Sequence, residues 1–423
     1  MRTPVISSER HSMEHLPVSI QATDSSGSFG AYLAVPKSGS GPGLVIAQEI
    51  FGVNKTMRDV ADNYAEEGYV VLVPDLFWRQ EPGVQLGHTD ADMQRAFGFY
   101  GGFDEAKGVE DIQATLKVLR ALPQCNGSAG VLGFCLGGKL AYLAACRTDA
   151  QVAVAYYGVG IEKAISEIDK VKGRLVMHVA GLDKFCPPEA QAQIAAAARG
   201  RPNVELYLYP GQDHAFARVS GEHYGKPAAL MAQQRTLAAL KREIGPEYDL
   251  AALWDKHCEY EFATRDVAAT MATMVAEPYV NHIPTMTGGV GAKMLARFYQ
   301  NHFVNSNPPD TSLVPISRTV GATQIVDEML FCFTHPTEIP WMLPGVAPTG
   351  KRVEVPLVAI VKFRGDKLCH EHIYWDQASV LVQIGLLDPE KAPMVGVEAA
   401  RKLLDENLPS NTLMAAWENT APN

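Results

Sequence analysis

The sequence predicts two domains, a doubly wound α/β domain followed by an α+β domain. Its 423 residues exceed the roughly 150 that one domain usually contains. Up to about residue 243, short apolar runs alternate with segments of helical period, which is typical of a mostly parallel sheet covered by helices. After Gly245 and Pro246 helices come first and longer alternating segments follow, which favours an antiparallel sheet. We predict an N-terminal tail at 1–17, domains at 18–243 and 249–412, and a C-terminal tail at 413–423.

The elements of the first domain follow from apolar runs and helical periodicity. Continuous apolar runs indicate strands that are buried on both faces, as central parallel strands are. We predict strands at 44–47, 69–73, 130–134, 152–156, 175–179 and 204–209. Helical periodicity predicts helices at 55–67, 103–122, 136–146, 189–199 and 227–242.

The second domain has a different order of elements. We predict helices at 250–262, 265–276 and 289–303, and then strands at 313–319, 324–334, 353–363 and 368–375. The turn at 364–367 between the last two strands, with the letters RGDK, fits a hairpin.

Composition and charge exclude several classes of protein. Lys and Arg number 37 against 47 Asp and Glu, a net charge of −10, so the basic surface that nucleic acids or anionic membranes select is missing. Residues 1–17 lack the apolar core of a signal peptide, and no run of about 18 apolar residues follows. We expect a cytoplasmic protein with no nucleic-acid or membrane partner. The seven cysteines include no C-x-x-C pair, which argues against a disulfide framework or a structural zinc site, and no cofactor is indicated.

The strongest local motif lies between a predicted strand and a predicted helix, where residues 133–138 read GFCLGG. This is the pattern of a nucleophile elbow with Cys135 as the nucleophile. The flanking glycines are expected because the turn is tight and a Cβ would collide where strand and helix pack together. Cys135 would then lie at a helix N-terminus, where free N–H groups favour the thiolate over the thiol.

The partners of such a nucleophile follow it in the order acid and then histidine, each on a loop after a later strand. Asp183 and His214 occupy the expected loops, and Cys135, His214 and Asp183 form the predicted triad. Other candidates fit less well: Asp213 reads as a turn residue, His178 as a core histidine within a strand, and His223 lies beyond the loop.

Five motifs of the first domain resemble those of the dienelactone hydrolases (carboxymethylenebutenolidases), which have the α/β-hydrolase fold. They read AQEIFGVN at 47–54, PDLFWRQ at 74–80, GFCLGG at 133–138, YYGVG at 156–160 and HAFAR at 214–218. The resemblance implies that Glu49 helps to form the thiolate when substrate arrives. It also implies that Arg79 and Arg218 bind the substrate carboxylate, since a guanidinium can bind a carboxylate through two hydrogen bonds.

Two residues depart from the family pattern. Ala215 stands where close members often carry a hydroxyl or glycine, and the bulky Trp78 beside Arg79 could reshape the substrate pocket.

The implied reaction opens an activated lactone that carries a carboxylate, through an acyl-thiol intermediate. The oxyanion would be held by the backbone N–H groups of Leu136 and Ile50, and His214 would assist the water that releases the acyl group. The expected partner is thus a small anionic lactone or ester. Two alternatives stay open: a broader carboxylesterase or thioesterase, and a small-molecule binding or association module whose hydrolase half is weakly active.

The second domain resembles the polyketide-cyclase-like (SnoaL-like) branch of the nuclear-transport-factor-like fold, an α+β cone-shaped half barrel with a pocket. The supporting motifs read NHIP at 281–284, GVGAKMLARFY at 289–299 and EHIYWD at 371–376. His282, Glu371 and Asp376 are the candidate pocket residues. His370 and His372 share one strand face but have no third ligand at a recognisable spacing, so we predict no metal there. Binding or formation of a homo-oligomer is the expected role.

Overall fold

The computed structural model describes residues 18–219 and 221–420. The chain divides between Glu247 and Tyr248 into two compact units, each with its own hydrophobic core. The predicted N-terminal tail at 1–17 and residues 421–423 of the predicted C-terminal tail lie outside the described residues.

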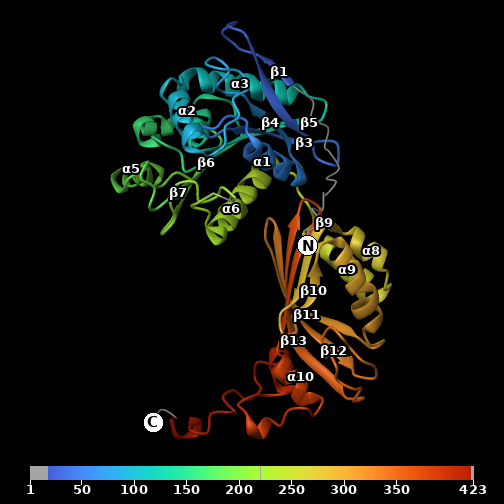
Figure 1. Ribbon diagram of the computed structural model, residues 1–423. Coiled ribbons are helices and arrows are strands. Elements are labelled where there is room, and N and C mark those ends of the chain that lie inside the picture. Colours follow the sequence, from blue (N-terminus) through green and yellow to red (C-terminus); the bar gives the residue numbers. More distant parts are fainter. Residues whose placement is uncertain (1–17, 220, 421–423) are drawn as a thin grey trace. The chain divides into compact units, whose positions relative to one another are not determined.

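An eight-stranded sheet forms the centre of the first unit (Figure 1), with the strand order β1-β2-β4-β3-β5-β6-β7-β8. The first two strands pair antiparallel, as β2 does with β4, and the other pairs are parallel. The strands are β1 (Val18–Gln21), β2 (Ser28–Ala34), β3 (Gly41–Ala47), β4 (Val70–Pro74), β5 (Cys125–Phe134), β6 (Val152–Tyr156), β7 (Arg174–Ala180) and β8 (Val204–Tyr209).

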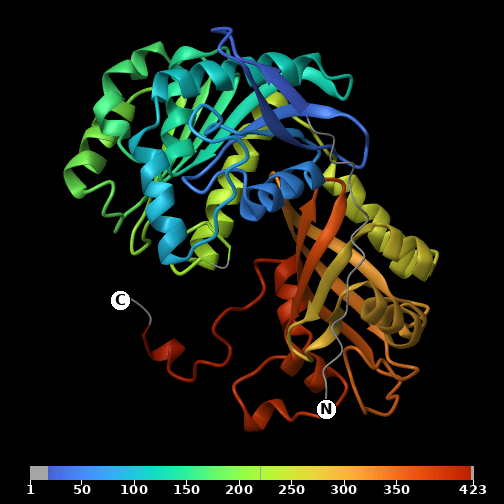
Figure 2. The same cartoon turned by 45° about the horizontal axis from the view of Figure 1, so that its top comes forward.

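Helices cover both faces of this sheet. They are α1 (Lys55–Glu66), α2 (Asp90–Gly101), α3 (Glu105–Ala121), α4 (Leu136–Arg147), the 3-10 helix η1 (Ile161–Lys170), α5 (Pro188–Ala198) and α6 (Lys226–Ile244). Helices α3 and α4 pack together on one face, and α1 and α6 cover the other (Figures 1 and 2). Side chains cap the starts of α1, α2 and α3; at α1, Asn54 accepts a hydrogen bond from the Met57 N–H.

Each predicted strand and helix of the first unit is present, with ends that shift by a few residues. Strands β4 and β6 are buried at every residue, as predicted for central strands. The antiparallel ribbon β1–β2, helix α2 and the 3-10 helix η1 were not predicted from the sequence. This ribbon alternates buried with exposed residues, so it lacks the apolar runs that revealed the other strands.

The second unit contains a six-stranded sheet in the order β10-β9-β14-β13-β12-β11, in which only β14 and β9 pair parallel. Every second residue of β13 is buried, so one sheet face forms the core. The strands are β9 (Met274–His282), β10 (Thr287–Val290), β11 (Ser312–Val320), β12 (Gln324–Thr334), β13 (Arg352–Arg364) and β14 (Lys367–Trp375).

The helices of this unit are short and partly irregular. They are α7 (Leu250–Cys258) with the π-helical turn η2 (Glu259–Ala263), α8 (Val267–Ala272), α9 (Ala292–Phe298) with the π-helical turn η3 (Tyr299–Phe303), η4 (Val304–Ser306), α10 (Gln377–Gln383), η5 (Pro389–Lys391), α11 (Glu398–Leu404) and η6 (Trp417–Thr420).

The four predicted strands and the hairpin turn of this unit are confirmed. Two helix predictions extend too far. The helix predicted at 265–276 ends at Ala272, because β9 begins at Met274, and the one predicted at 289–303 begins only after β10. In both places the apolar residues also suit a half-buried strand. Pairing of β9 with β14, and of β10 with β9, decides the outcome.

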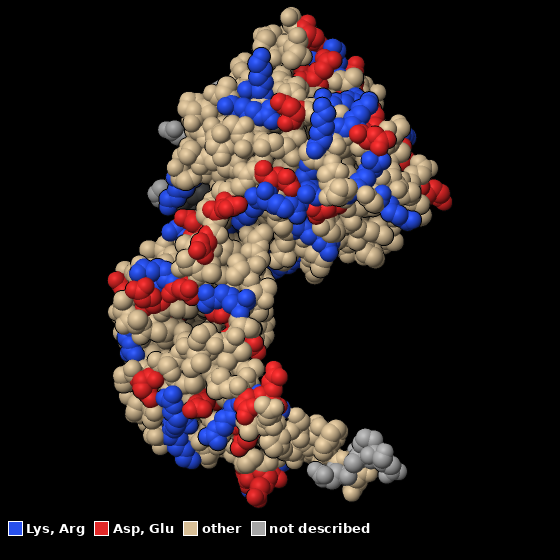
Figure 3. All heavy atoms as spheres, turned by 180° about the vertical axis from the view of Figure 1, so that it is seen from behind, with Lys and Arg blue, Asp and Glu red and all other residues tan. Residues whose placement is uncertain are grey.

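Basic and acidic side chains are interspersed over the face drawn in Figure 3. Among the residues that the structure describes, no helix has both the length and the apolar composition needed to cross a membrane.

Candidate active site

Cys135 occupies the turn between β5 and α4, with φ 57° and ψ −115°. Non-glycine residues rarely adopt a positive φ, so the turn holds this side chain in a strained position. The neighbouring glycines explain how the turn is tolerated. A Cβ on Gly133 would lie 1.9 Å from the Gly137 carbonyl oxygen, and a Cβ on Gly137 would lie 2.2 Å from the Ala47 carbonyl oxygen. The steric reason predicted for both glycines is therefore present.

The N-terminus of α4 and the loop after β3 meet at this turn. The Leu136 N–H belongs to the first turn of α4, where no carbonyl of the same helix can accept it. The Gly137 N–H donates to the Gln48 carbonyl at 3.1 Å, which ties the loop containing Glu49 and Ile50 to the start of the helix. Cys135 is 9 % exposed and lies within this junction.

His214 and Asp183 come from the loops that follow β8 and β7. The Nδ1 atom of His214 lies 2.7 Å from Oδ2 of Asp183, and Asp183 is buried. Burial disfavours the charged imidazolium, but hydrogen bonds to Asp183 and Cys135 outweigh burial and raise the pKa of His214 to about 10. The structure thus brings the three predicted residues together, with the imidazole between the carboxylate and the thiol.

Two aromatic rings hold the imidazole from its sides, and sequence reasoning assigned a role to neither. The rings of Tyr157 and Phe185 lie 5.0 and 4.9 Å from the ring of His214, each nearly edge-on. Tyr157 is buried, and its hydroxyl contacts Oε1 of Glu49 at 3.5 Å. Tyr157 belongs to the YYGVG motif, which was the available signal.

Buried Glu49 and partly buried Arg218 form an ion pair beside this group, with 3.2 Å between Oε2 and Nη1. The Nε atom of Arg218 is buried without a hydrogen-bond partner. The guanidinium lies over the ring of Phe51, whose other neighbour is the imidazole of His88 at 4.6 Å. Burial lowers the pKa of His88, and the positive charge of Arg218 adds to this effect. The sequence analysis did not identify His88.

Backbone strain gathers around the same residues. Besides Cys135, Tyr157 has φ 37° and Ala215 has φ 63°. The left-handed conformation of Ala215 explains why a glycine suits this position. Strained residues that persist are usually held by their surroundings for a functional reason.

Comparisons with known proteins identify the family to which the first unit is related. The model of the dienelactone hydrolase family matches residues 29–244. The chain belongs to the dienelactone hydrolase family. It is 41 % identical over 217 residues to the carboxymethylenebutenolidase of Pseudomonas sp. (strain P51), across 51 % of this chain and 91 % of that protein. It is 38 % identical over 221 residues to the carboxymethylenebutenolidase of Pseudomonas putida, across 52 % of this chain and 93 % of that one.

A solved structure is also similar. The dienelactone hydrolase from Anabaena variabilis ATCC 29413 shares 17 % identity with a TM-score of 0.42, across 56 % of this chain and 100 % of that chain. Membership of the dienelactone hydrolase family makes this protein a hydrolase of the lactone or ester class.

In the structure, Arg79 and Trp78 contact each other and acidic residues of the same unit. The guanidinium of Arg79 hydrogen-bonds to the buried Asp111 and to Asp24, and it stacks on the ring of Trp78 at 4.3 Å. Trp78 in turn donates its Nε1–H to Asp111 at 2.9 Å. The structure therefore does not join Arg79 to the ion pair of Arg218, because an acidic neighbour that the motif did not reveal holds its side chain.

The rejected alternatives for the triad have structural roles of their own. His178 is buried in the core, with Nδ1 at 2.9 Å from the Tyr209 hydroxyl and Nε2 at 2.9 Å from the Thr236 hydroxyl. Asp213 accepts the backbone N–H of His214 at 2.6 Å, as a turn residue does, and His223 lies 3.9 Å from Asp213. These contacts leave Asp183 as the acid that His214 faces.

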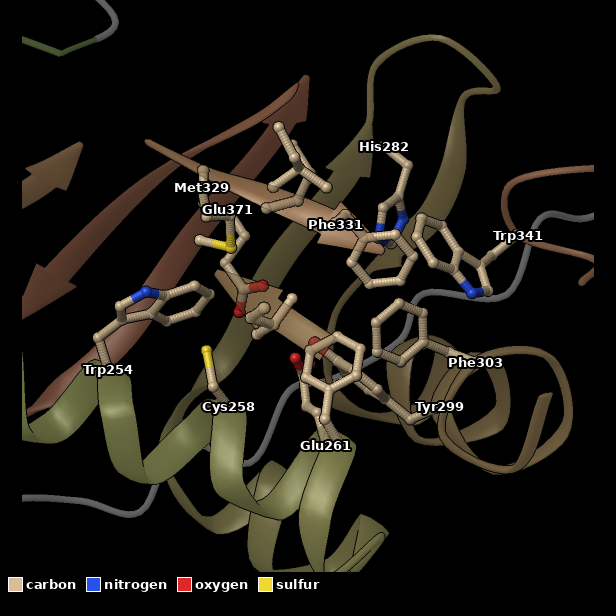
Figure 4. A pocket seen from close by; sticks show the side chains of 15 residues that line it. Trp254, Cys258, Glu261, His282, Tyr299, Phe303, Met329, Phe331, Trp341 and Glu371 are labelled. Carbon is tan, nitrogen blue, oxygen red and sulfur yellow. The ribbon is translucent and has the colours of Figure 1, made fainter. Parts of the chain in front are cut away.

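In the second unit, His282 and Glu371 line a cavity of about 40 Å³. Figure 4 shows an aromatic end around His282 and a polar end where Glu371, Glu261 and Cys258 point toward the same space. The prediction of Asp376 as a pocket residue is wrong: it caps α10 by accepting the Ala378 N–H, because β14 ends just before it.

His370 and His372 share the outer face of β14, as predicted, and pack against Tyr279.

Proposed function

We propose that the first unit opens a carboxylate-bearing activated lactone of the dienelactone type, with Cys135, His214 and Asp183 as its catalytic triad. The observation that carries this proposal is the position of His214. Its Nδ1 lies 2.7 Å from Oδ2 of Asp183, and its interactions with Asp183 and Cys135 raise its pKa to about 10. An imidazolium of this kind stabilises a neighbouring thiolate as the attacking group.

In the proposed reaction the Cys135 thiolate adds to the lactone carbonyl. The oxyanion receives hydrogen bonds from the N–H groups of Leu136 and Ile50. Collapse of this intermediate breaks the ring C–O bond, and the leaving group is an enolate, which is more stable than an alkoxide. The enolate takes up the proton that His214 holds as an imidazolium, which leaves His214 neutral. His214 then removes a proton from water, whose oxygen attacks the thioester, and this proton passes to the sulfur as the acid and the thiol are released.

The substrate carboxylate binds at Arg218 in this proposal. This guanidinium has a buried Nε–H without a hydrogen-bond acceptor, so it can bind a second carboxylate. A carboxylate that arrives there competes with Glu49, and the released Glu49 takes part in forming the Cys135 thiolate.

A broader carboxylesterase is the second candidate, and the contacts of Arg79 favour it. With Arg79 held by Asp111 and Asp24, one arginine rather than two serves the substrate carboxylate. The rate would then depend less on whether the substrate carries a carboxylate. Simple activated esters would be hydrolysed at rates closer to those of carboxylated lactones.

A panel of substrates tests both candidates. Carboxylated lactones and uncharged aryl esters are assayed with the unchanged protein, with Cys135→Ala and with the matched control Cys146→Ala, whose thiol is buried in α4. The proposal requires that Cys135→Ala stops turnover of the lactones while Cys146→Ala retains it. Equal rates on lactones and esters would favour the broader esterase, and an active Cys135→Ala would overturn both candidates.

For the domain organisation we propose an α/β-hydrolase domain at 18–243 and a SnoaL-like pocket domain at 249–412. The cavity that His282 and Glu371 line supports a pocket in the second domain. A role in homo-oligomer formation is tested by comparing the mass in solution of the full chain with that of a chain ending at residue 247.

A further inference from the structure

Three side chains of the second unit bring ligand atoms together in the core. His257 and Glu261 lie four residues apart on α7 and η2, and Glu371 comes from β14. One ligand atom of each lies within 4.8 Å of the others, and all three residues are buried. The distances from Nε2 of His257 are 3.1 Å to Oε1 of Glu261 and 3.3 Å to Oε1 of Glu371.

The hydrogen bonds behind His257 fix which ring nitrogen carries a proton. Thr273 donates its hydroxyl proton to the Thr270 carbonyl at 2.6 Å. Its oxygen lies 2.6 Å from Nδ1 of His257, so Nδ1 must be the donor of that contact. The neutral tautomer therefore carries its proton on Nδ1, and the lone pair of Nε2 points at the two glutamates.

This arrangement also fixes the plane of the ring. Trp254 stacks on His257 with 5.6 Å between ring centroids and an interplanar angle of 17°. Metal-binding histidines usually have their second nitrogen held by such an outer hydrogen bond, which orients the ring and sets its tautomer.

Two buried oxygens in the same place lack hydrogen bonds. Oε1 of Glu371 receives none despite its contact with His257, and the hydroxyl of Tyr299 has none either. Tyr299 is 1 % exposed and lines the cavity together with both glutamates. A buried polar atom without a partner is costly, so the cluster is incomplete without a further group.

If His257 is an imidazolium, its single proton on Nε2 forms a hydrogen bond with Glu261 and leaves Oε1 of Glu371 without one. Two buried carboxylates beside one imidazolium leave a net charge of −1, whereas a divalent cation beside neutral His257 leaves none. Ligand atoms bound to one Zn²⁺ at about 2.0–2.2 Å lie about 2.9–3.5 Å apart, and the two distances from Nε2 fall in this range.

We propose that His257, Glu261 and Glu371 bind a first-row divalent metal ion such as Zn²⁺ or Mn²⁺. An imidazole with two carboxylates suits these ions better than Ca²⁺ or Mg²⁺. Because both glutamates line the cavity, the ion faces it (Figure 4), and Tyr299 lies beside it. The site lies outside the residues matched to the hydrolase family, so it is independent of the lactone chemistry.

The test uses the full chain in a His370→Gln/His372→Gln background, which removes the outer histidine pair as a competing site. The protein is stripped with a chelator, titrated with Zn²⁺ or Mn²⁺, and analysed for bound metal. We expect one tightly bound ion of at least one of the two metals per chain. Retention of neither metal by the stripped protein would overturn the proposal.

Variants identify the ligands. Glu371→Gln and His257→Gln should each weaken binding more than about 100-fold, and Thr273→Val, which removes only the outer hydrogen bond, by about 10-fold to 100-fold. Glu277→Gln, an exposed carboxylate on β9, is the matched control and should bind as the background does. Unchanged affinity in Glu371→Gln would contradict the proposal.

A further test leaves the three proposed ligands unchanged. The His370→Gln/His372→Gln protein is loaded with Co²⁺ and its absorption spectrum is recorded. We expect ligand-field bands typical of Co²⁺ with protein ligands, displaced by one equivalent of Zn²⁺. A spectrum identical to that of Co²⁺ in buffer would overturn the proposal, even if Glu371→Gln failed to fold.

Discussion

Arg218 and Glu49 form an ion pair at 3.2 Å, in which the Glu49 side chain is 3 % exposed and the Arg218 side chain 17 %. Paired charges in such a place are stable together, whereas one left alone is costly. A substrate that brings its own carboxylate can take the place of Glu49 on the guanidinium. In the proposed function, this pair links binding of the substrate carboxylate to the role of Glu49, which lies beside Tyr157.

Arg218→Met should reduce kcat/KM for a carboxylated lactone by at least about 30-fold, which corresponds to about 2 kcal/mol for a lost buried charge pair. The rate on an uncharged aryl ester should change far less, because that substrate makes no ion pair. Steady-state kinetics on both substrates measure the difference, with Arg79→Met as the control. Equal reductions of kcat/KM on both substrates would show that Arg218 does not bind the substrate carboxylate.

The raised pKa of His214 predicts how stability depends on pH. Since the pKa in the folded chain is about 10 and the ordinary value is 6.5, the folded state holds this proton more tightly. The resulting stabilisation is complete below pH 6.5 and is lost as the pH rises to about 10. NMR of labelled histidine should show His214 losing its proton near pH 10. The buried His178, whose pKa burial lowers to about 3, should stay neutral and serve as the internal control.

Asp183→Asn should lower kcat by about 10⁴-fold, because an amide favours the wrong tautomer of the imidazole. Asp213→Asn is the matched change, since Asp213 accepts the backbone N–H of His214, as an amide oxygen can, and its other contact is to His223 at 3.9 Å. Its kcat should stay within about threefold of the unchanged protein if Asp183 alone orients the ring. A larger loss in Asp213→Asn than in Asp183→Asn would reassign the acid.

Gly137→Ala should destabilise the protein by more than about 3 kcal/mol, because the new Cβ would meet the Ala47 and Gln48 carbonyls inside a packed junction. Gly98→Ala in α2 is the control, since nothing lies within 4 Å of its Cβ position. Replacing a glycine by alanine in an exposed helix should stabilise the protein by about 0.5–1 kcal/mol. Urea unfolding of both variants gives the comparison, and a tolerated Gly137→Ala would contradict the tight elbow.

The sequence predicted the parts of this molecule that depend on local pattern. Continuous apolar strands, the elbow glycines and the loop positions of Asp183 and His214 all leave signals along the chain. The ribbon β1–β2 leaves a weaker one, because its residues are buried on one side only. Helix α2 was missed, although Thr89 and Asp92 form a capping box at its start.

Contacts between residues far apart in the chain could not be predicted from the sequence. Nothing in the PDLFWRQ motif shows that Asp111, from α3, holds Arg79. The same limit applies to the second unit, where the fold brings together Glu261 from η2 and Glu371 from β14. The histidine pair at 370 and 372 was visible by spacing, whereas His257 acquires its neighbours through the fold.

Intact-protein mass spectrometry of the acyl intermediate tests the central claim most directly. The full chain is mixed with an activated carboxylated ester or lactone and quenched in acid within the first turnover. The account predicts one added acyl mass, located on Cys135 by peptide mapping, absent in Cys135→Ala and retained in Cys146→Ala. An acyl group on another residue, or full turnover by Cys135→Ala, would contradict it.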